Sequence, residues 1–326
     1  MFGPATLVQG RGRSDHDALR KDVRHGLLAT PKRLPFRWFY DEEGSRLFDE
    51  ICTLPEYYLP RAEREILEAH ADELAGVFPS GPTVVELGSG TAVKTRIVLE
   101  AILRRHGSAH YVPVDIAGSV LVESSRSLRS AYPSLGVTAL HGDYDDALAE
   151  WSHFPGAPRL VLWLGSNIGN FEREEATDFL GKLRERLKPG DRVLVGIDLI
   201  KDRAVLEAAY NDSRGVTARF NKNMIVRMMR ELGAEFDLSG FSHRAFFNEA
   251  TGCIEMHLLC DRPQRVDVRA LGLQVDFSAG ESIHTESSHK YSREEIEALA
   301  TSAGLAVEHV WTDREGLLAD VVMGLG

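Results

Sequence analysis

Long apolar runs are absent from this 326-residue sequence. No stretch reaches the ~18 apolar residues that a membrane-spanning helix requires. The N-terminal segment carries Arg11, Arg13 and Asp15 where a signal peptide would have its apolar core. These absences argue against a membrane partner and against secretion, so we expect a cytoplasmic protein.

Cysteine is scarce, and basic residues are outnumbered. Cys52, Cys253 and Cys260 form no CxxC pair, so we expect buried thiols in a reducing compartment rather than a disulfide framework or a metal site.

The 38 Lys and Arg residues are outnumbered by 49 Asp and Glu residues, which gives a net charge of −11 without any run of Lys or Arg. This charge opposes binding to phosphate backbones, so nucleic acid is not an expected partner. The acidic surface and the lack of an obvious dimer helix favour a monomer.

The sequence is instead rich in short strands that alternate with helices. This alternation is typical of an α/β protein with a doubly wound parallel sheet. The predicted strands are 84–87, 111–114, 137–140, 159–164 and 192–197, and the predicted helices between them are 94–105, 117–131 and 173–187. Two further strands at 305–311 and 318–323 predict an antiparallel hairpin, which makes seven strands in a mostly parallel sheet.

The region 201–289 interrupts this alternation. It is too long for a loop and has helical spacing at 206–210 and 222–232 and strand patterns at 253–259 and 264–271. We therefore predict an α+β substrate-binding domain of residues 16–61 plus 201–289, beside a cofactor-binding domain of residues 62–200 plus 290–326. Residues 1–15, which are rich in glycine and charge, are expected to form a flexible N-terminus.

The first of these strands runs directly into a glycine turn, Val84-Val-Glu-Leu-Gly-Ser-Gly-Thr91. Gly88 and Gly90 permit a sharp turn and a close approach to a ligand, while Glu86 places an acid where a cationic amino or sulfonium group is favoured. A dinucleotide loop is disfavoured because Val93 follows where that loop needs a small residue. The segment is typical of the S-adenosylmethionine loop of methyltransferases, although a plain strand-to-helix turn explains the two glycines equally well.

Acidic side chains follow the next two strands, at the sheet edge where a cofactor binds. Asp115 stands 25 positions after Gly90, where an acid can accept hydrogen bonds from both ribose hydroxyls; a helix N-cap is the alternative role. Asp143 can accept a hydrogen bond from the adenine amino group while Tyr144 covers the ring face. By itself, Asp143 is equally consistent with a turn.

The fourth strand ends in a polar segment, Gly165-Ser-Asn-Ile-Gly-Asn-Phe171. We expect the substrate to meet the methyl donor here. Gly165 exposes a carbonyl that can approach the nucleophile, and Asn170 offers both a donor and an acceptor to an amino-acid-like group. A structural Asn-Gly turn is the alternative.

Five segments spread along the chain form a combination that is more specific than the glycine loop. They are 38–49 (WFYDEEGSRLFD), 54–58 (LPEYY), 86–91 (ELGSGT), 164–170 (LGSNIGN) and 285–288 (TESS). Together they resemble the histidine Nα-methyltransferases of ergothioneine biosynthesis, and the resemblance runs from about residue 17 to 324. It implies a class I methyltransferase fold and an enzyme that trimethylates the α-amino group of L-histidine without a metal. The donor would be S-adenosyl-L-methionine, and the products hercynine and S-adenosyl-L-homocysteine.

The resemblance also assigns roles to individual residues. The implied substrate residues are Tyr57, Glu286 and Ser288 at the imidazole, Asn170 and Tyr210 at the carboxylate, Phe48 and Met256 around the ring, and Tyr40 near the amine. The implied donor residues are Gly88 and Lys94 at the methionine part, and Asp115, Asp143 and Tyr144 at the nucleoside. Each of these residue types is also common in packing or at a solvated surface, so the roles depend on the resemblance.

More than one hypothesis about the substrate is compatible with the sequence. Glu286 suits an imidazole better than an indole, which has a single donor, so we expect histidine rather than the tryptophan that related enzymes use. Two rival hypotheses are a methyltransferase for a different amine or carboxylic acid and a non-catalytic amino-acid-binding protein. His289, next to the predicted imidazole site, is expected to face solvent.

Overall fold

The computed structural model describes residues 6–10, 15–156 and 158–326, and the chain divides into two compact units. The first unit contains Leu59–Ile200 and Lys290–Gly326 together with an N-terminal strand. The second contains residues 15–58 and Lys201–His289. The segment that interrupts the strand–helix alternation therefore folds with the chain that precedes the first unit.

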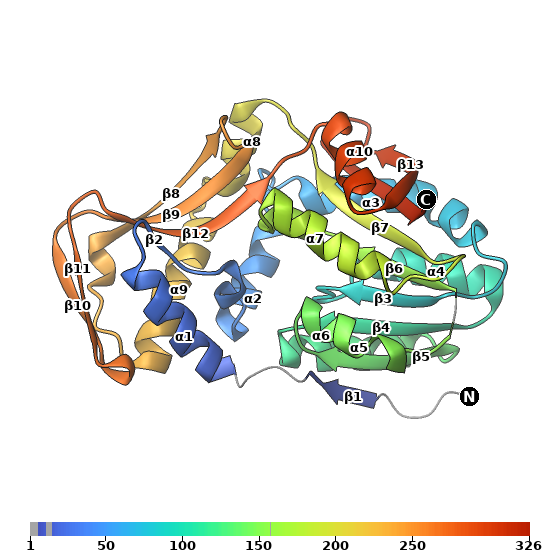
Figure 1. The fold of residues 1–326 in the computed structure, drawn as a ribbon, viewed down its shortest axis with the longest axis horizontal. Coiled ribbons are helices and arrows are strands. Elements are labelled where there is room, and N and C mark those ends of the chain that lie inside the picture. Colours follow the sequence, from blue (N-terminus) through green and yellow to red (C-terminus); the bar gives the residue numbers. More distant parts are fainter. Residues whose placement is uncertain (1–5, 11–14, 157) are drawn as a thin grey trace. The chain divides into compact units, whose positions relative to one another are not determined.

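An eight-stranded sheet forms the centre of the first unit (Figure 1). Its order is β1-β5-β4-β3-β6-β7-β14-β13, and β14 runs antiparallel to β7 and β13 while the other pairs are parallel. The strands are β1 (Thr6–Gln9), β3 (Thr83–Leu87), β4 (Ala109–Asp115), β5 (Leu135–His141), β6 (Arg159–Trp163), β7 (Arg192–Asp198), β13 (Leu305–Thr312) and β14 (Leu318–Leu325). This confirms the predicted α/β class and the terminal hairpin, with one strand more than the seven predicted.

The additional strand is β1, which pairs in parallel with β5 at the edge of the sheet. It lies in the segment predicted to be a flexible terminus. A four-residue strand is too short to show a periodic pattern, and its pairing with β5 is a long-range contact that composition does not reveal. Residues 1–5 and 11–14 of that segment lie outside the described residues.

Helices cover both faces of this sheet. They are α3 (Leu59–Gly76), α4 (Thr95–His106), α5 (Gly118–Ala131), α6 (Tyr144–Ala149), α7 (Arg173–Arg184) and α10 (Arg293–Ser302). Side chains alternate along β3, so Val85 and Leu87 join the core beneath α6, α7 and α10. Glu86 points to the other face, which α3, α4 and α5 cover. Two cores therefore hold the carboxyl ends of β3, β4, β5 and β6 in fixed positions.

The second unit contains a four-stranded sheet, β2-β12-β9-β8, and a separate hairpin, β10-β11. Its strands are β2 (Lys32–Arg33), β8 (Phe241–Asn248), β9 (Cys253–Cys260), β10 (Gln264–Val268), β11 (Leu273–Phe277) and β12 (Ser282–His289). Its helices are α1 (Asp15–Leu28), α2 (Glu42–Ile51), α8 (Arg203–Tyr210) and α9 (Val216–Leu232). Helix α9 packs against α2 and against strands β8 and β9. Of the cysteines, Cys253 and Cys260 are buried and Cys52 is half-buried.

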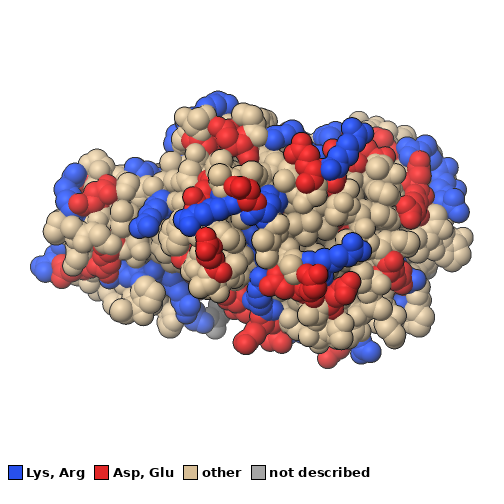
Figure 2. Space-filling view, turned by 90° about the horizontal axis from the view of Figure 1, so that it is seen from above, with Lys and Arg blue, Asp and Glu red and all other residues tan. Residues whose placement is uncertain are grey.

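Acidic and basic side chains are interspersed on the face seen in Figure 2. Charges of opposite sign form ion pairs in the molecule, one of them between Arg192 and Glu308 at 2.5 Å. Exposed pairs of this kind contribute at most about 1 kcal/mol each. Among the described residues, no helix combines the length and the apolar character needed to cross a bilayer.

Candidate active site

The glycine turn after β3 is tightly enclosed at Gly88 and open at Gly90. Both glycines have left-handed φ angles, 73° and 48°. A Cβ added to Gly88 would lie 3.0 Å from Asn167 Nδ2 and 3.1 Å from the Tyr144 hydroxyl, whereas a Cβ on Gly90 would meet nothing within 4 Å. Between them, the Ser89 hydroxyl is buried and, within the described structure, has no hydrogen-bond partner. The turn therefore offers bare backbone and an unsatisfied hydroxyl, as a loop that receives a polar ligand would.

Asp115, at the end of β4, joins the glycine turn to the start of α5. Its carboxylate accepts hydrogen bonds from the N–H of Gly90 at 2.7 Å and from the N–H of Ala117 at 2.8 Å. Burial raises the pKa of Asp115, and the backbone hydrogen bonds oppose this rise. The alternative of a helix N-cap is wrong, because the N-cap of α5 is Ala117. A ligand role is compatible with these contacts, since each carboxylate oxygen has a second lone pair.

Glu86 is buried on the α4 side of the sheet. It accepts hydrogen bonds from the Thr95 hydroxyl, at 2.6 Å, and from the Tyr111 hydroxyl. Burial raises the pKa of Glu86 to about 7, while these two hydrogen bonds act in the opposite direction. The contacts place Glu86 beneath the glycine turn, where it ties β3 to α4 and β4.

Glu63, on α3, connects the glycine turn to the end of β6 and was not among the residues predicted from the sequence. The carboxylate is fully buried and accepts a hydrogen bond from the N–H of Gly165 at 2.6 Å and another from the ammonium group of Lys94. Lys94, predicted to lie at the methionine part of the donor, is thus already paired with an acid. Burial and the charge of Glu63 also raise the pKa of the neighbouring Asp320 well above its ordinary value. One signal was available, since Glu63 shares the buried face of its helix with Ile66 and therefore needs a partner.

Tyr144 and Asp143 follow β5 as predicted, at the start of α6. The Asp143 side chain accepts a hydrogen bond from the N–H of Asp146 and caps the helix. Asp143 therefore has the local structural role that was the alternative to adenine binding. The Tyr144 ring packs on Phe171 and against Trp163, with centroid distances of 5.9 and 5.7 Å. Its hydroxyl faces Gly88, which brings the ends of β3 and β5 together.

The polar segment after β6 forms a short 3-10 helix, Asn167–Asn170. Asn170 is half-buried at its end, and Asn167, which was not predicted as a site residue, donates to the Leu164 carbonyl at 2.9 Å. Ser166 has a left-handed φ of 56°, which is rare for a residue with a Cβ, and its buried hydroxyl accepts from the N–H of Asp198 at 3.1 Å. Such strained backbone persists where the surroundings hold it, and it is frequent at functional sites.

The two units share the predicted substrate side of the site, which consists of seven substrate residues and Tyr40. Asn170 belongs to the first unit, as does Gly165. The other seven belong to the second unit: Tyr40, Phe48, Tyr57, Tyr210, Met256, Glu286 and Ser288. Contacts within the second unit bring these seven together.

Four of them form a row of aromatic rings. Phe48 lies between Tyr40 and Tyr57, with centroid distances of 5.7 and 6.3 Å, and Tyr57 in turn contacts Tyr210 at 6.2 Å. Phe220 on α9, which was not predicted from the sequence, packs against both Tyr40 and Phe48. Burial raises the pKa of Tyr57 well above its ordinary value, and Tyr210 and Glu286 add to the rise. Tyr57 is therefore a neutral hydrogen-bond donor near an acid.

The other three lie on the paired strands β9 and β12. Glu286 is directly opposite Met256 in the ladder, and the buried Ser288 accepts a hydrogen bond from the Tyr210 hydroxyl at 2.9 Å. A bulge between His284 and Glu286 shifts the register, and Thr285 at the bulge donates to Asn221 and to the Met256 carbonyl.

His289 ends β12 and is buried, with 3% of its surface exposed. The expectation that it faces solvent was wrong. A single polar residue at the end of a strand carries no local pattern that indicates burial. In the first unit, the following residue, Lys290, forms a buried ion pair with Asp198 at 2.7 Å.

The fold and the donor side of the site define the class of protein. A mostly parallel sheet with a terminal antiparallel hairpin carries a glycine turn after β3 and acids after β4 and β5. This is the arrangement of a class I methyltransferase that uses S-adenosylmethionine.

Comparison with known proteins narrows this class. The family model described as histidine-specific methyltransferase, SAM-dependent, matches residues 19–324, and the chain belongs to this family. Histidine N-alpha-methyltransferases of Mycobacterium tuberculosis and Mycolicibacterium smegmatis are 46% and 44% identical; the alignments cover 92% of this chain and 93% and 92% of theirs. Ergothioneine biosynthesis protein 1 of Neurospora crassa is 32% identical over 86% of this chain, which spans 32% of that longer protein.

Proposed function

We propose that the protein transfers three methyl groups to the α-amino group of L-histidine, which yields hercynine for ergothioneine biosynthesis. Membership of the histidine-specific family supports the substrate class. The observation that carries the proposal is the grouping of Tyr57, Tyr210, Glu286 and Ser288 in one unit, where a carboxylate lies near neutral hydroxyl donors. Such a set can bind an imidazole, which has one N–H donor and one nitrogen acceptor.

The imidazole would be recognised by groups of opposite hydrogen-bonding character. Glu286 accepts from the ring N–H, and a charge-assisted hydrogen bond of this kind is stronger than one between neutral groups. Ser288 accepts from Tyr210, and because a hydroxyl can both accept and donate, it is a candidate partner for the other ring nitrogen. Tyr57 stays protonated and is a second candidate donor to that nitrogen.

The donor side fits S-adenosylmethionine. When bound, this molecule supplies an electrophilic methyl group on a sulfonium. Gly88 and Gly90 leave room for a ligand close to the backbone, and Ser89 has a buried hydroxyl in need of a partner. Asp115 and Asp143 offer carboxylate lone pairs to the ribose and the adenine, and Tyr144 offers an aromatic face.

The residues act mainly by positioning. The amine must arrive without its proton and in line with the methyl group, a requirement that orientation can meet without a strong acid. Tyr40 contacts Phe48 and Phe220, which holds its ring in place near the proposed amine position. As methyl groups accumulate, the product ammonium loses hydrogen bonds, and aromatic faces remain favourable partners for it.

Calorimetric titration of L-histidine and L-tryptophan in the presence of S-adenosyl-L-homocysteine tests this proposal. We expect histidine to bind, and Glu286→Gln to weaken its affinity about 10- to 100-fold, because a hydrogen bond to a charged group contributes about 1.5–3 kcal/mol. The control is Glu249→Gln, on the exposed turn after β8, which should leave the affinity unchanged. Tight binding of tryptophan without binding of histidine would refute the assignment.

A further inference from the structure

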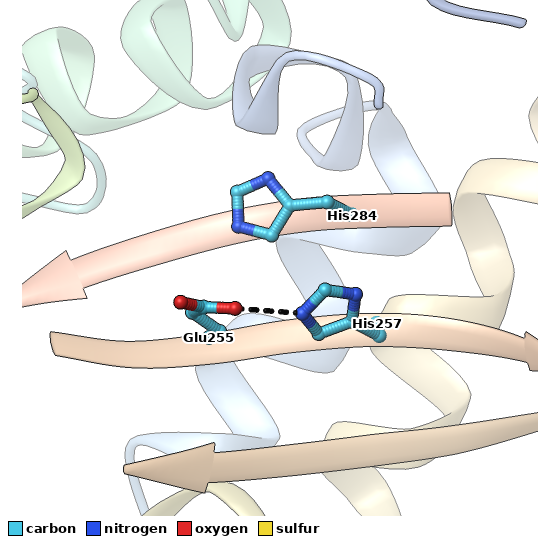
Figure 3. Close-up of side chains that lie close together, drawn as sticks. All are labelled: Glu255, His257 and His284. Atoms are coloured by element: carbon cyan, nitrogen blue, oxygen red, sulfur yellow. Dashed lines mark hydrogen bonds and ion pairs between the residues drawn. The ribbon is translucent and has the colours of Figure 1, made fainter. Parts of the chain in front are cut away.

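Three side chains with metal-binding atoms meet on the half-exposed face of the second unit's sheet (Figure 3). Glu255 and His257 are two positions apart on β9, so they point to the same face, and His284 on β12 lies directly opposite His257. One ligand atom of each lies within 4.8 Å of the others. In the described part of the chain, no other group of three potential ligands is this close.

The spacing of two of these atoms already matches a metal site. Nε2 of His257 forms a hydrogen bond with Oε2 of Glu255 at 3.0 Å, which a bound ion would replace. Two ligand atoms that bind zinc at about 2.1 Å with angles between 90° and the tetrahedral value lie about 3.0–3.4 Å apart. The His257 and His284 rings are 5.0 Å apart between centroids. Nε2 of His284 is 3.2 Å from Ser287 Oγ, so its Nδ1 would bind the ion unless that contact is exchanged.

Polar side chains around the cluster hold the proposed ligands in orientation. Asn248 Nδ2 donates to Oε1 of Glu255 at 2.7 Å, which leaves Oε2 directed at His257. Ser282 Oγ lies 3.2 Å from Nδ1 of His257, and Phe246 stacks on the same ring at 5.5 Å. Metal-binding histidines characteristically use the second ring nitrogen for a hydrogen bond of this kind, which fixes the ring and the tautomer.

We propose that Glu255, His257 and His284 form a binding site for a divalent transition metal, with zinc as the best-matched ion. Two imidazoles and one carboxylate are a known zinc donor set, completed by water at the fourth position. The ion would fasten β9 to β12. Those strands carry Met256 and Glu286, and Met256 lies on the opposite face of β9 because it alternates with Glu255 and His257. The ion would therefore stabilise the strands that carry these residues, and the site stands independently of the substrate proposed above.

Calorimetric titration of the untagged protein with Zn²⁺ in a non-chelating buffer tests the site. Histidine must be left out because it binds zinc itself. We expect one ion per chain, at least a tenfold weaker affinity in each of His257→Asn, His284→Asn and Glu255→Gln, and about 10- to 100-fold weaker affinity in Asn248→Ala. Zn²⁺ should also raise the Tm of the unaltered protein but not that of the ligand variants.

The matched control is His153→Asn. His153 forms a similar pair with Glu150, at 2.8 Å, in the first unit, so its loss should leave the zinc affinity unchanged. Co²⁺ provides a second readout on the unaltered protein, since a site of this donor set should produce visible d–d absorption that Zn²⁺ displaces. The proposal is overturned if zinc affinity is unaffected by the three ligand substitutions, or if Co²⁺ gives only the spectrum of the aqueous ion.

Discussion

The pH dependence of stability should change when Glu86 is replaced by glutamine. Glu86 is buried on the α4 side of the sheet, where burial raises its pKa from the ordinary 4.5 to about 7. The folded state therefore favours the protonated carboxyl. Its stabilising effect is complete below the unfolded pKa and is lost as the pH rises through the folded pKa near 7.

The size of this effect follows from the two pKa values. At 1.36 kcal/mol per pKa unit, the difference between 4.5 and 7 corresponds to about 3 kcal/mol, most of which is lost between pH 5 and pH 8.5. Glutamine has no such titration and keeps one oxygen for Thr95 or Tyr111. We therefore compare the free energy of unfolding of Glu86→Gln with that of the unaltered protein at each pH. This difference should shift in favour of the variant by about 2–3 kcal/mol between pH 5 and pH 8.5.

Denaturant unfolding at the two pH values, with hydrogen exchange at β3 amides to report on the first unit, measures this difference. The control is Glu100→Gln, an exposed carboxylate that also accepts a hydrogen bond from a tyrosine, Tyr132. It should alter stability by less than about 0.5 kcal/mol at both pH values. If Glu86→Gln shows the same pH dependence as the unaltered protein, the ionisation of Glu86 is not opposed by burial and the reasoning fails.

Three further substitutions test other parts of the molecule. Gly88→Ala introduces a Cβ at a φ of 73° and 3.0 Å from a side-chain nitrogen. In thermal unfolding it should lower stability by about 1–2 kcal/mol, and in calorimetry it should weaken S-adenosyl-L-homocysteine binding. Unchanged stability and affinity would contradict the crowding. Tyr210→Phe removes the hydroxyl that donates to Ser288. It should raise KM for histidine about tenfold while KM for the methyl donor stays constant. An equal rise in both KM values would indicate a general loss of structure. Ser292→Ala removes the N-cap of α10 and should lower the free energy of unfolding by about 1 kcal/mol in urea; no measurable loss would mean that the capping box contributes nothing.

Most strands and helices of the first unit could be predicted because each has its own local pattern. Each strand is a short apolar run, each helix has its own spacing, and a proline and glycine pair, Pro189-Gly190, marks the start of β7. Asp115, Asp143 and Tyr144 could be proposed from the same patterns, since residues that follow a parallel strand lie at the edge where ligands bind, whereas Lys94 came from the resemblance.

The substrate side could not be derived in this way. Glu286 and Tyr57 are 229 positions apart in the sequence, and long-range contacts such as the pairing of β12 with β9 and the packing of α2 on α9 bring them into one unit. No local pattern encodes such contacts, so those residues came from resemblance to a family. Asn221, whose side chain joins Thr285 to the chain near His257, was missed for the same reason.

The sequence also did not predict which charged residues pair with one another. The pairing of Lys94 with Glu63 depends on the approach of α3 to the start of α4, which is set by packing rather than by spacing. A lysine after a glycine loop predicts a ligand contact, but a buried acid within reach competes for the same ammonium group.

A competition assay tests the proposed activity most directly. The protein is mixed with S-adenosyl-L-methionine and equal amounts of L-histidine and L-tryptophan, and the products are identified by mass spectrometry. The proposed activity predicts histidine carrying three methyl groups on its α-nitrogen, together with S-adenosyl-L-homocysteine. Methylated tryptophan in place of methylated histidine, or binding of histidine without any methyl transfer, would contradict it.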